Sequence, residues 1–134
     1  VLRDEIQITL DAAADRAGLA SHCGQLSDAL AQVEATIKAV SEADDSALAL
    51  ANATIFLDAM GHVVIAWMWL KQAVAATVGL DKGHEPDTAF YRGKLAAAQF
   101  FYRYELPKIQ SNLAIVASLD STCYDLASDQ FVGI

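Results

Sequence analysis

An unbroken apolar stripe at helical spacing runs through the second half of the chain. Its members recur every three or four residues: Tyr91, Leu95, Ala98, Tyr102, Leu106, Ile109, Leu113 and Val116. Residues at this spacing share one face of an α-helix, so the region is expected to fold as a helix with one buried side. Pro107 has no N–H to donate to the carbonyl of Arg103. Because the stripe continues past this proline, we expect a kink there rather than an end.

Two shorter helical patterns open the chain. Residues 2–17 are amphipathic, and Gly18 is the expected stop. A second pattern begins near Ser21, a candidate N-cap, and ends at an acidic connection over residues 41–46. The apolar side of this second helix is predicted to be a narrow, heptad-like seam formed by Leu26, Leu30, Val33, Ile37 and Val40.

The third segment, residues 47–80, is the longest and the most apolar. Gly83 lies in the loop after it, and Pro86 opens a fourth helix that starts near Asp87 or Thr88. Four helices with three connections predict an all-α fold, namely an antiparallel up-down four-helix bundle with long third and fourth helices.

The length and composition of the chain agree with one helical domain. A chain of 134 residues has the size of a single domain and can bury a core. Its apolar share is 54%, and it contains only two prolines. We therefore expect a single bundle over residues 1–134, of which residues 120–134 form an irregular tail.

The apolar third segment raises the question of a transmembrane helix. A span needs about 20 predominantly apolar residues. The run without an ionisable group covers only residues 63–70, between His62 and Lys71, with Asp58 one turn earlier. We therefore expect a central bundle helix. Its Trp67-Met68-Trp69 cluster is assigned to the core and an interface rather than to a cofactor site.

Charge is distributed unevenly along a chain whose formal net charge is −8. Residues 1–58 carry ten acidic and three basic residues, net −7, whereas residues 88–110 carry four basic residues and one acidic, net +3. The acidic excess disfavours nucleic acid or an anionic membrane as the main partner. We expect Arg92, Lys94 and Arg103 to contact acidic side chains, within the chain or on a partner domain. Phosphates of a nucleotide-type ligand are the less favoured alternative, because no clustered glycines accompany these residues.

Residues 90–107 hold six of the eleven aromatic residues, and these fall on helical stripes: Phe90, Tyr91, Phe100, Phe101, Tyr102 and Tyr104. Helical spacing assigns them to the core, with tyrosine hydroxyls at its rim. Stacking on nucleic-acid bases is the alternative that we set aside. Gly93 and the three alanines at 96–98 are expected to let a neighbouring helix approach closely.

The residues that could carry chemistry are few. Asp58 and His62 are four residues apart on the third segment, where they could ligate a metal or form a carboxylate–histidine pair. We favour a structural pair, since buried polar groups ordinarily find a partner. His84 and Glu85 are expected to be solvated in the loop. We assign no catalytic, cofactor-binding or metal-binding residue.

The two cysteines, Cys23 and Cys123, show neither a disulfide framework nor zinc-ligand spacing. Reduced thiols in a cytoplasmic protein are the expectation. Charged residues at positions 3–5 interrupt the first apolar residues, which disfavours a signal peptide. The chain begins with Val1 rather than methionine, so we expect a piece of a longer protein.

Several motifs together resemble a known family. They are Trp67-Met68-Trp69, Phe90-Tyr91-Arg92-Gly93-Lys94-Leu95, Ala98-Gln99-Phe100-Phe101 and Leu106-Pro107. They look like the extra C-terminal helical domain in a branch of the acyl-CoA dehydrogenases, the branch that includes 3-methylmercaptopropionyl-CoA dehydrogenases. The resemblance spans residues 26–119 and is most specific over residues 90–107.

The resemblance implies an accessory domain of an FAD-dependent enzyme. The full chain of such an enzyme oxidises an acyl-CoA to a 2,3-enoyl-CoA. Its catalytic carboxylate and FAD contacts would lie in domains that precede Val1, and this chain would pack on those domains or on another subunit. Two alternatives stay open: a stand-alone dimerisation or adaptor bundle, and a metal-binding bundle that uses Asp58 and His62.

Overall fold

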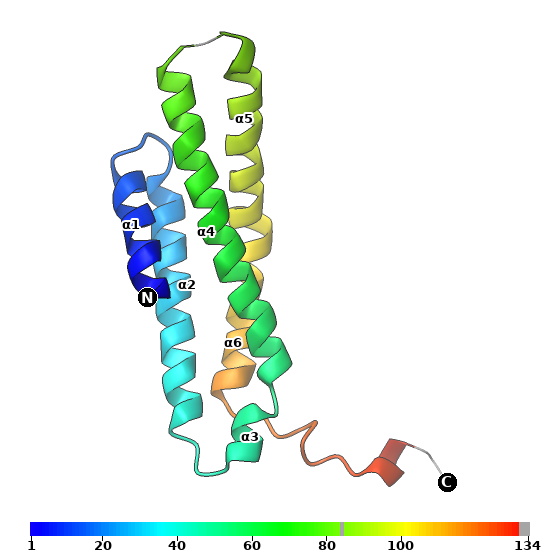
Figure 1. Ribbon diagram of the computed structural model, residues 1–134. Helices are drawn as coiled ribbons and strands as arrows, with labels where there is room; N and C mark the ends of the chain where they lie inside the picture. Colours follow the sequence, from blue (N-terminus) through cyan, green and yellow to red (C-terminus); the bar gives the residue numbers. More distant parts are fainter. Residues whose placement is uncertain (84, 132–134) are drawn as a thin grey trace.

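The computed structural model describes residues 1–83 and 85–131 (Figure 1). Its helical elements, in chain order, are α1 (Leu2–Ala14), α2 (Ala20–Ser41), α3 (Ser46–Leu50), α4 (Ala53–Asp81), α5 (Glu85–Phe100), the π-helical turn η1 (Phe101–Glu105), the 3₁₀ turn η2 (Leu106–Lys108), α6 (Ile109–Ala117) and the 3₁₀ turn η3 (Ser128–Phe131). No β-strand occurs in these two described ranges, and the predicted all-α class is confirmed.

The long helices lie side by side and reverse direction at short connections. α2, α4 and the α5–α6 segment run along the length of the molecule, and α1 packs against α2 and α4 (Figure 1). The chain after α6 leaves the helices and extends away from them, toward η3. The packed part of the molecule therefore comprises the helices from α1 to α6, without the tail that follows α6.

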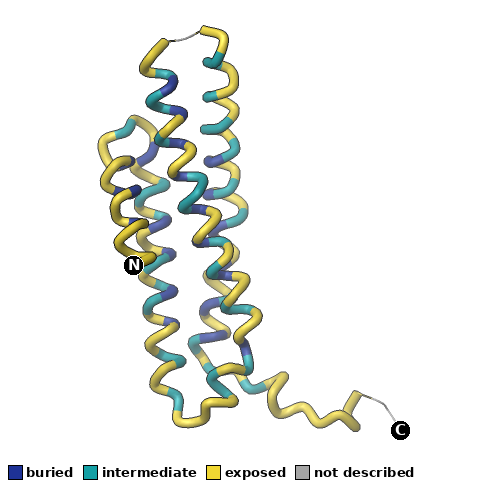
Figure 2. The backbone as a smooth tube through the Cα atoms, in the orientation of Figure 1, coloured by how far each residue is buried: buried dark blue, intermediate teal, exposed yellow. Residues whose placement is uncertain are grey.

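The core lies between the inward faces of these helices (Figure 2). The bulkiest fully buried side chains are Tyr102, Ile6, Leu26, Leu70, Ile109, Leu113 and Val63. Four of the seven buried residues of α4 are alanines, namely Ala59, Ala66, Ala73 and Ala76. Small side chains on a central helix let neighbouring helices approach it closely, so large side chains such as Tyr102 can fill the space beside α4.

The buried face of α2 differs from the predicted seam. The structure buries Leu26, Ala29, Val33 and Thr36. Ile37, assigned to the seam, is 50% exposed. The predicted seam was chosen from the larger apolar residues at heptad spacing. In the structure, α2 packs against α4 and α6, and the small residues Ala29 and Thr36 are buried.

The predicted single helix over residues 47–80 is interrupted at Asn52. α3 begins after Asp45, whose carboxylate accepts hydrogen bonds from the backbone N–H groups of Ala47 and Leu48. At the break, the side-chain amide of Asn52 donates to the carbonyl of Asp120, over 2.9 Å. This bond ties the start of α4 to the end of the α6 region, so the break is held by a tertiary contact.

The predicted N-cap of α2 is wrong by two residues. The capping position is Leu19, without a side-chain cap, and Ser21 lies in the first turn. Gly18 has φ +81°, a left-handed conformation that glycine adopts without strain. α1 itself ends at Ala14, so the predicted helix over residues 2–17 is three residues too long. Gly18 lies in the turn between α1 and α2, and this tight turn places the start of α2 earlier than Ser21 suggested.

The kink expected at Pro107 takes the form of two irregular turns. In η1 the N–H of Leu106 donates to the carbonyl of Phe101 instead of that of Tyr102. η2 then carries the chain past the proline into α6. Because Pro107 cannot donate, a wide turn followed by a tight turn accommodates the missing hydrogen bond.

One close approach between helices occurs at Gly79 rather than at Gly93. A Cβ atom on Gly79 would overlap the ring of Tyr91, which packs across from α5. Around Gly93 no described atom lies within 4 Å of such a Cβ. The expectation that Gly93 permits a close helix contact is therefore wrong within this chain.

α4 is long and apolar enough to cross a membrane by length and composition alone. One third of its most apolar window, 33%, is buried inside the molecule, against α2, α5 and α6. A core helix satisfies the same two criteria, so length and composition do not separate the two possibilities.

Candidate functional site

A groove of about 580 Å³ separates the beginning of α2 from α5 and η1. On one side lie the α1–α2 turn and the first turns of α2. On the other side, positions 92, 99 and 103 present one face of the α5–η1 helix. The lining residues are Ala17, Gly18, Leu19, Ser21, His22, Gln25, Arg92, Leu95, Ala96, Gln99, Tyr102 and Arg103.

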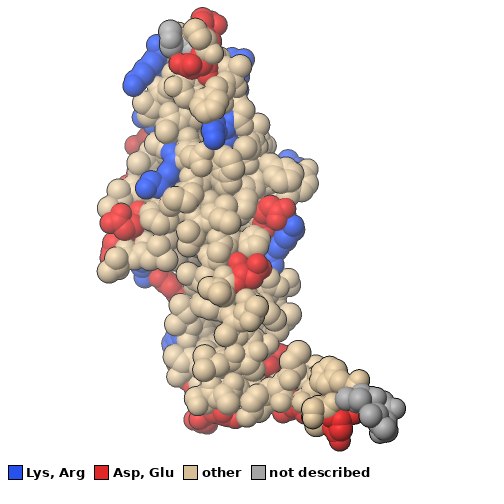
Figure 3. All heavy atoms as spheres, turned by 45° about the vertical axis from the view of Figure 1, so that its right-hand side comes forward, with Lys and Arg blue, Asp and Glu red and all other residues tan. Residues whose placement is uncertain are grey.

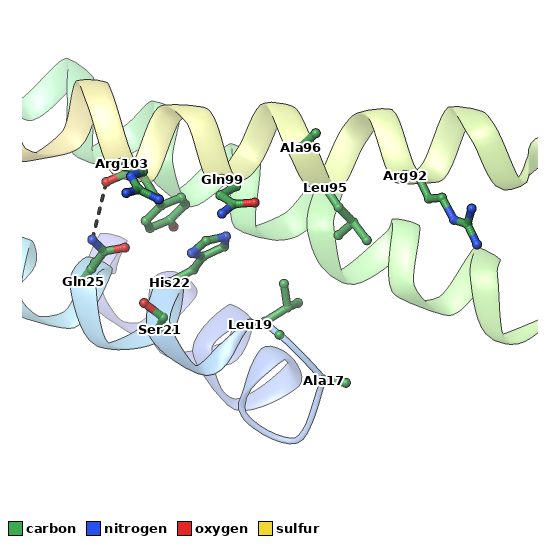
Figure 4. Close-up of a pocket in the computed structure, with 12 residues that line it drawn as sticks. Ala17, Leu19, Ser21, His22, Gln25, Arg92, Leu95, Ala96, Gln99 and Arg103 are labelled. Atoms are coloured by element: carbon green, nitrogen blue, oxygen red, sulfur yellow. Dashed lines mark hydrogen bonds between the residues drawn. The ribbon is translucent and has the colours of Figure 1, made fainter.

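Polar side chains gather at one end of this groove (Figure 4). The ring of His22 stacks on Tyr102, with centroids 4.5 Å apart and an interplanar angle of 9°. The side-chain amide of Gln25 donates to the carbonyl of Tyr102 over 3.5 Å. That carbonyl is available because the π-helical turn directs the N–H of Leu106 to Phe101 instead. Gln99 and Arg103 extend over the same end.

The middle of the groove is apolar, and its far end is basic. Leu19, Leu95 and Ala96 lie between the polar end and Arg92 (Figure 4). No aspartate or glutamate belongs to the lining residues. Within the described ranges, neither Arg92 nor Arg103 forms an ion pair. The groove is thus a positively charged site in an acidic chain.

His22 is a partly buried titratable group at this site. Its Nδ1 atom is buried and lacks a hydrogen-bond partner. Burial lowers the pKa of His22 below the ordinary value for histidine, because the charged imidazolium loses hydration there. The ring is accordingly neutral at neutral pH and packs as a flat, weakly polar plate against Tyr102.

The lowered pKa of His22 predicts a loss of stability in mild acid. Below about pH 6.5, the ordinary pKa of histidine, His22 becomes protonated in the unfolded chain but stays neutral in the folded chain. The contribution of neutral His22 to the free energy of unfolding is therefore lost as the pH falls from about 6.5 toward the lowered pKa of His22 in the folded chain. His22→Phe keeps a ring against Tyr102 but cannot titrate. Urea unfolding over a pH series should show the wild type falling relative to this variant; parallel curves would contradict the prediction.

The predicted pair of Asp58 and His62 forms a surface cluster with η1. Nδ1 of His62 lies 2.9 Å from the carbonyl oxygen of Asp58 and 3.7 Å from its Oδ2, and Nε2 lies 4.0 Å from Oε2 of Glu105. Glu105 also accepts from Lys108 over 2.8 Å. Across the described part of the chain, no three His, Cys, Asp or Glu side chains are arranged to hold a metal ion. The cluster therefore links α4 to η1, and the metal-binding alternative gains no support.

Comparison with known proteins gives the family. The family model described as "Acetyl-CoA dehydrogenase C-terminal like" matches residues 2–127. The chain belongs to this family. It is also 35% identical over 77 residues to the broad-specificity linear acyl-CoA dehydrogenase FadE5 of Mycobacterium tuberculosis. That match covers 57% of this chain and 13% of the relative. The predicted resemblance to the C-terminal helical domain of acyl-CoA dehydrogenases is confirmed.

In this member of the family, large apolar side chains also project outward from α4, α5 and η1. Exposed residues on this side are Leu57, Val64, Ile65, Phe90, Phe100 and Tyr104, which we call the α4/α5 outer surface. Figure 3, which brings the α5 side forward, shows uncharged atoms over much of this face, with clusters of acidic and basic atoms among them. The core assignment of the aromatic residues is therefore correct for Tyr102 and wrong for Phe90, Phe100 and Tyr104.

The remaining predicted residues are scattered. Lys94 donates to the side chain of Gln72 over 3.0 Å and lies over the rings of Trp69 and Phe90, at 5.7 and 5.4 Å from their centroids. Among the described residues Lys94 forms no ion pair, so pairing within the chain is not observed, and pairing with a partner domain stays a prediction. Both cysteines are free. His84 lies outside the described residues.

His22 and Gln25 were not singled out by sequence analysis. His22 precedes Leu26 by four residues, on the face of α2 that the structure buries. A histidine in line with buried positions is the signal that could have found it. Its partner Tyr102 lies 80 positions away along the chain, and that partner could not be read from spacing.

Proposed function

We propose that this chain is a non-catalytic accessory domain of an FAD-dependent acyl-CoA dehydrogenase. The family match over residues 2–127 and the similarity to FadE5 support this proposal. Since the match covers only 13% of the relative, the oxidation of acyl-CoA to 2,3-enoyl-CoA is assigned to parts of the protein that precede this chain.

The observation that carries the proposed role is the α4/α5 outer surface. Phe100 is 56% exposed and Leu57 is 71% exposed, although both are large and apolar. Aromatic and aliphatic residues are concentrated at the centres of protein interfaces. The surface therefore packs on the catalytic domains of the same chain or on another subunit of a homo-oligomer.

The groove residues do not fit a flavin. An isoalloxazine ring needs a flat slot and donors along its edge. His22, the planar side chain at the polar end, already stacks on Tyr102, and only Gln25 and Gln99 supply amides. We assign no FAD contact, catalytic group or metal ligand to this chain. FAD and the acyl-CoA substrate belong to the proposed parent protein.

The same proposal extends to architecture and location. Residues 1–134 form one bundle unit in which α5, η1, η2 and α6 together act as a fourth antiparallel member. Residues 120–131 are its tail and include the short turn η3, and residues 132–134 of the predicted tail lie outside the described residues. The parent protein is cytoplasmic.

The test compares the isolated chain with the longer protein that contains it. We expect the longer protein to show flavin absorption and to oxidise acyl-CoA with an artificial electron acceptor. The 134-residue chain should be colourless and inactive. A flavin spectrum from the isolated chain would contradict the proposal. So would a reading frame that starts at this chain, which would favour the stand-alone dimerisation module.

A charge placed on the α4/α5 outer surface tests the docking role. Leu57→Glu should leave the stability of the isolated chain within about 0.5 kcal/mol, because the side chain is exposed. In the longer protein the same change should lower the thermal midpoint or dissociate subunits. Ile8→Glu on α1, at a position 63% exposed, is the matched control and should have neither effect. Equal effects of both substitutions would contradict the assignment of this surface.

A further inference from the structure

We propose that the groove between α2 and α5 binds a small organic anion. Its carboxylate or phosphate group lies at the polar end, beside Arg103 and Gln99. Its short apolar body lies along Leu19 and Leu95. This site is separate from the α4/α5 outer surface and does not depend on the docking role.

The polar end presents several donors with few partners of their own. Arg103 forms no ion pair within residues 1–83 and 85–131, and its guanidinium extends over Gln25 and His22 (Figure 4). A guanidinium offers paired N–H donors in a planar fork that matches both carboxylate and phosphate oxygens. Gln99 lies beside it with its amide toward the groove. These polar groups lie along the same end of the groove, as the few polar groups of a ligand site do.

The backbone and the rings beneath hold this end in place. The side-chain amide of Gln25 donates to the carbonyl of Tyr102 over 3.5 Å, a long hydrogen bond. The ring of His22 is fixed by stacking on Tyr102, which is itself 1% exposed. Because Tyr102 is buried and His22 packs on its ring, a ligand has less of this floor to order, and less binding free energy is lost.

The middle of the groove selects against a bare inorganic ion. Leu19 is 2% exposed, and with Leu95 and Ala96 it forms an apolar wall next to the polar end. Arg92 is eleven positions from Arg103, roughly 16 Å along a helix, so one compact ion cannot contact both. A short alkyl chain attached to the anionic group covers the wall between them.

Charge supports an anion over a cation or a neutral ligand. The lining residues include two arginines and no carboxylate. The chain as a whole carries a net charge of −8, which repels anions at long range. Binding must therefore come from contacts at the groove, and substitution of Arg103 should weaken it.

The experiment titrates the isotope-labelled 134-residue chain with four probes, in a phosphate-free buffer, and follows NMR chemical shifts. Hexanoate and hexyl phosphate carry both the anion and the apolar body. Acetate lacks the body, and hexanamide lacks the charge. We expect saturable shifts at the groove residues with hexanoate or hexyl phosphate, and at least about tenfold weaker binding of the other two. The stronger of the first two identifies the anionic group.

Two arginine variants make the result specific. Arg103→Gln should weaken binding of the better probe at least about tenfold, whereas Arg3→Gln, a matched loss of charge on α1, should leave it unchanged. Both side chains are exposed, so neither change should unfold the chain. Equal binding of hexanamide, unchanged affinity of the Arg103→Gln variant, equal loss in both variants, or no saturable shift would each overturn the proposal.

Discussion

Replacement of Tyr102 by alanine should lower the free energy of unfolding by about 3–5 kcal/mol, the range for removing a large aromatic side chain from a core. Tyr102 is 1% exposed and contacts several elements at once. Its ring stacks on His22 of α2, and its hydroxyl donates to the carbonyl of Ala66 in α4 over 2.8 Å. Truncation leaves a cavity at the junction of three helical segments.

Tyr102→Phe separates the ring from the hydroxyl. The ring and its stacking remain, and the loss of one buried hydrogen bond should cost about 1 kcal/mol. Urea unfolding of both variants, monitored by circular dichroism, measures the two contributions. If the phenylalanine variant lost as much stability as the alanine variant, the hydroxyl rather than ring packing would hold the junction together.

Gly79→Ala should destabilise the chain by about 1–3 kcal/mol, the usual cost of overpacking. The new methyl group would overlap the ring of Tyr91, so the ring or α5 must move. Alanine at a helical site ordinarily gains about 0.5–1 kcal/mol over glycine, which offsets part of this cost. Thermal unfolding of the variant measures the net change.

Gly61→Ala in the same helix is the matched control. Nothing lies within 4 Å of a Cβ atom at Gly61, so this change should stabilise the chain by about 0.5–1 kcal/mol. The two substitutions are chemically identical and should have opposite signs. In addition, Tyr91→Leu should recover part of the loss in the Gly79→Ala background. Stabilisation by both alanines would show that Tyr91 moves aside at no cost.

Local patterns were sufficient for the long helices and insufficient for their interruptions. The stripe from Tyr91 to Val116 correctly predicted a helical region that continues past Pro107. The break at Asn52 could not be predicted, because its amide partner is the carbonyl of Asp120, 68 residues away. The burial of small residues on α2 likewise depends on which helices lie opposite, a tertiary property that spacing does not encode.

At the candidate site, too, the sequence predicted some features and the packed structure was needed for others. Arg92 and Arg103 were singled out for their charge, and the structure places both in one groove. The residues that line this groove include no acidic side chain, which the net charge of the first half of the chain did not suggest. The outward position of Phe90, Phe100 and Tyr104 also escaped prediction. Helical spacing shows which residues share a face, but only the packed structure shows which face has a neighbour.

The two irregular turns around Pro107 have a consequence for helical phase. A π turn takes more residues per revolution than an α-helix, and a 3₁₀ turn takes fewer, so η1 lags the regular rotation and η2 advances it. The two deviations have opposite sign and largely cancel. Ile109, Leu113 and Val116 therefore remain in angular step with Tyr102, although no continuous α-helix joins them. This compensation allows a proline to lie inside the longest apolar stripe of the chain.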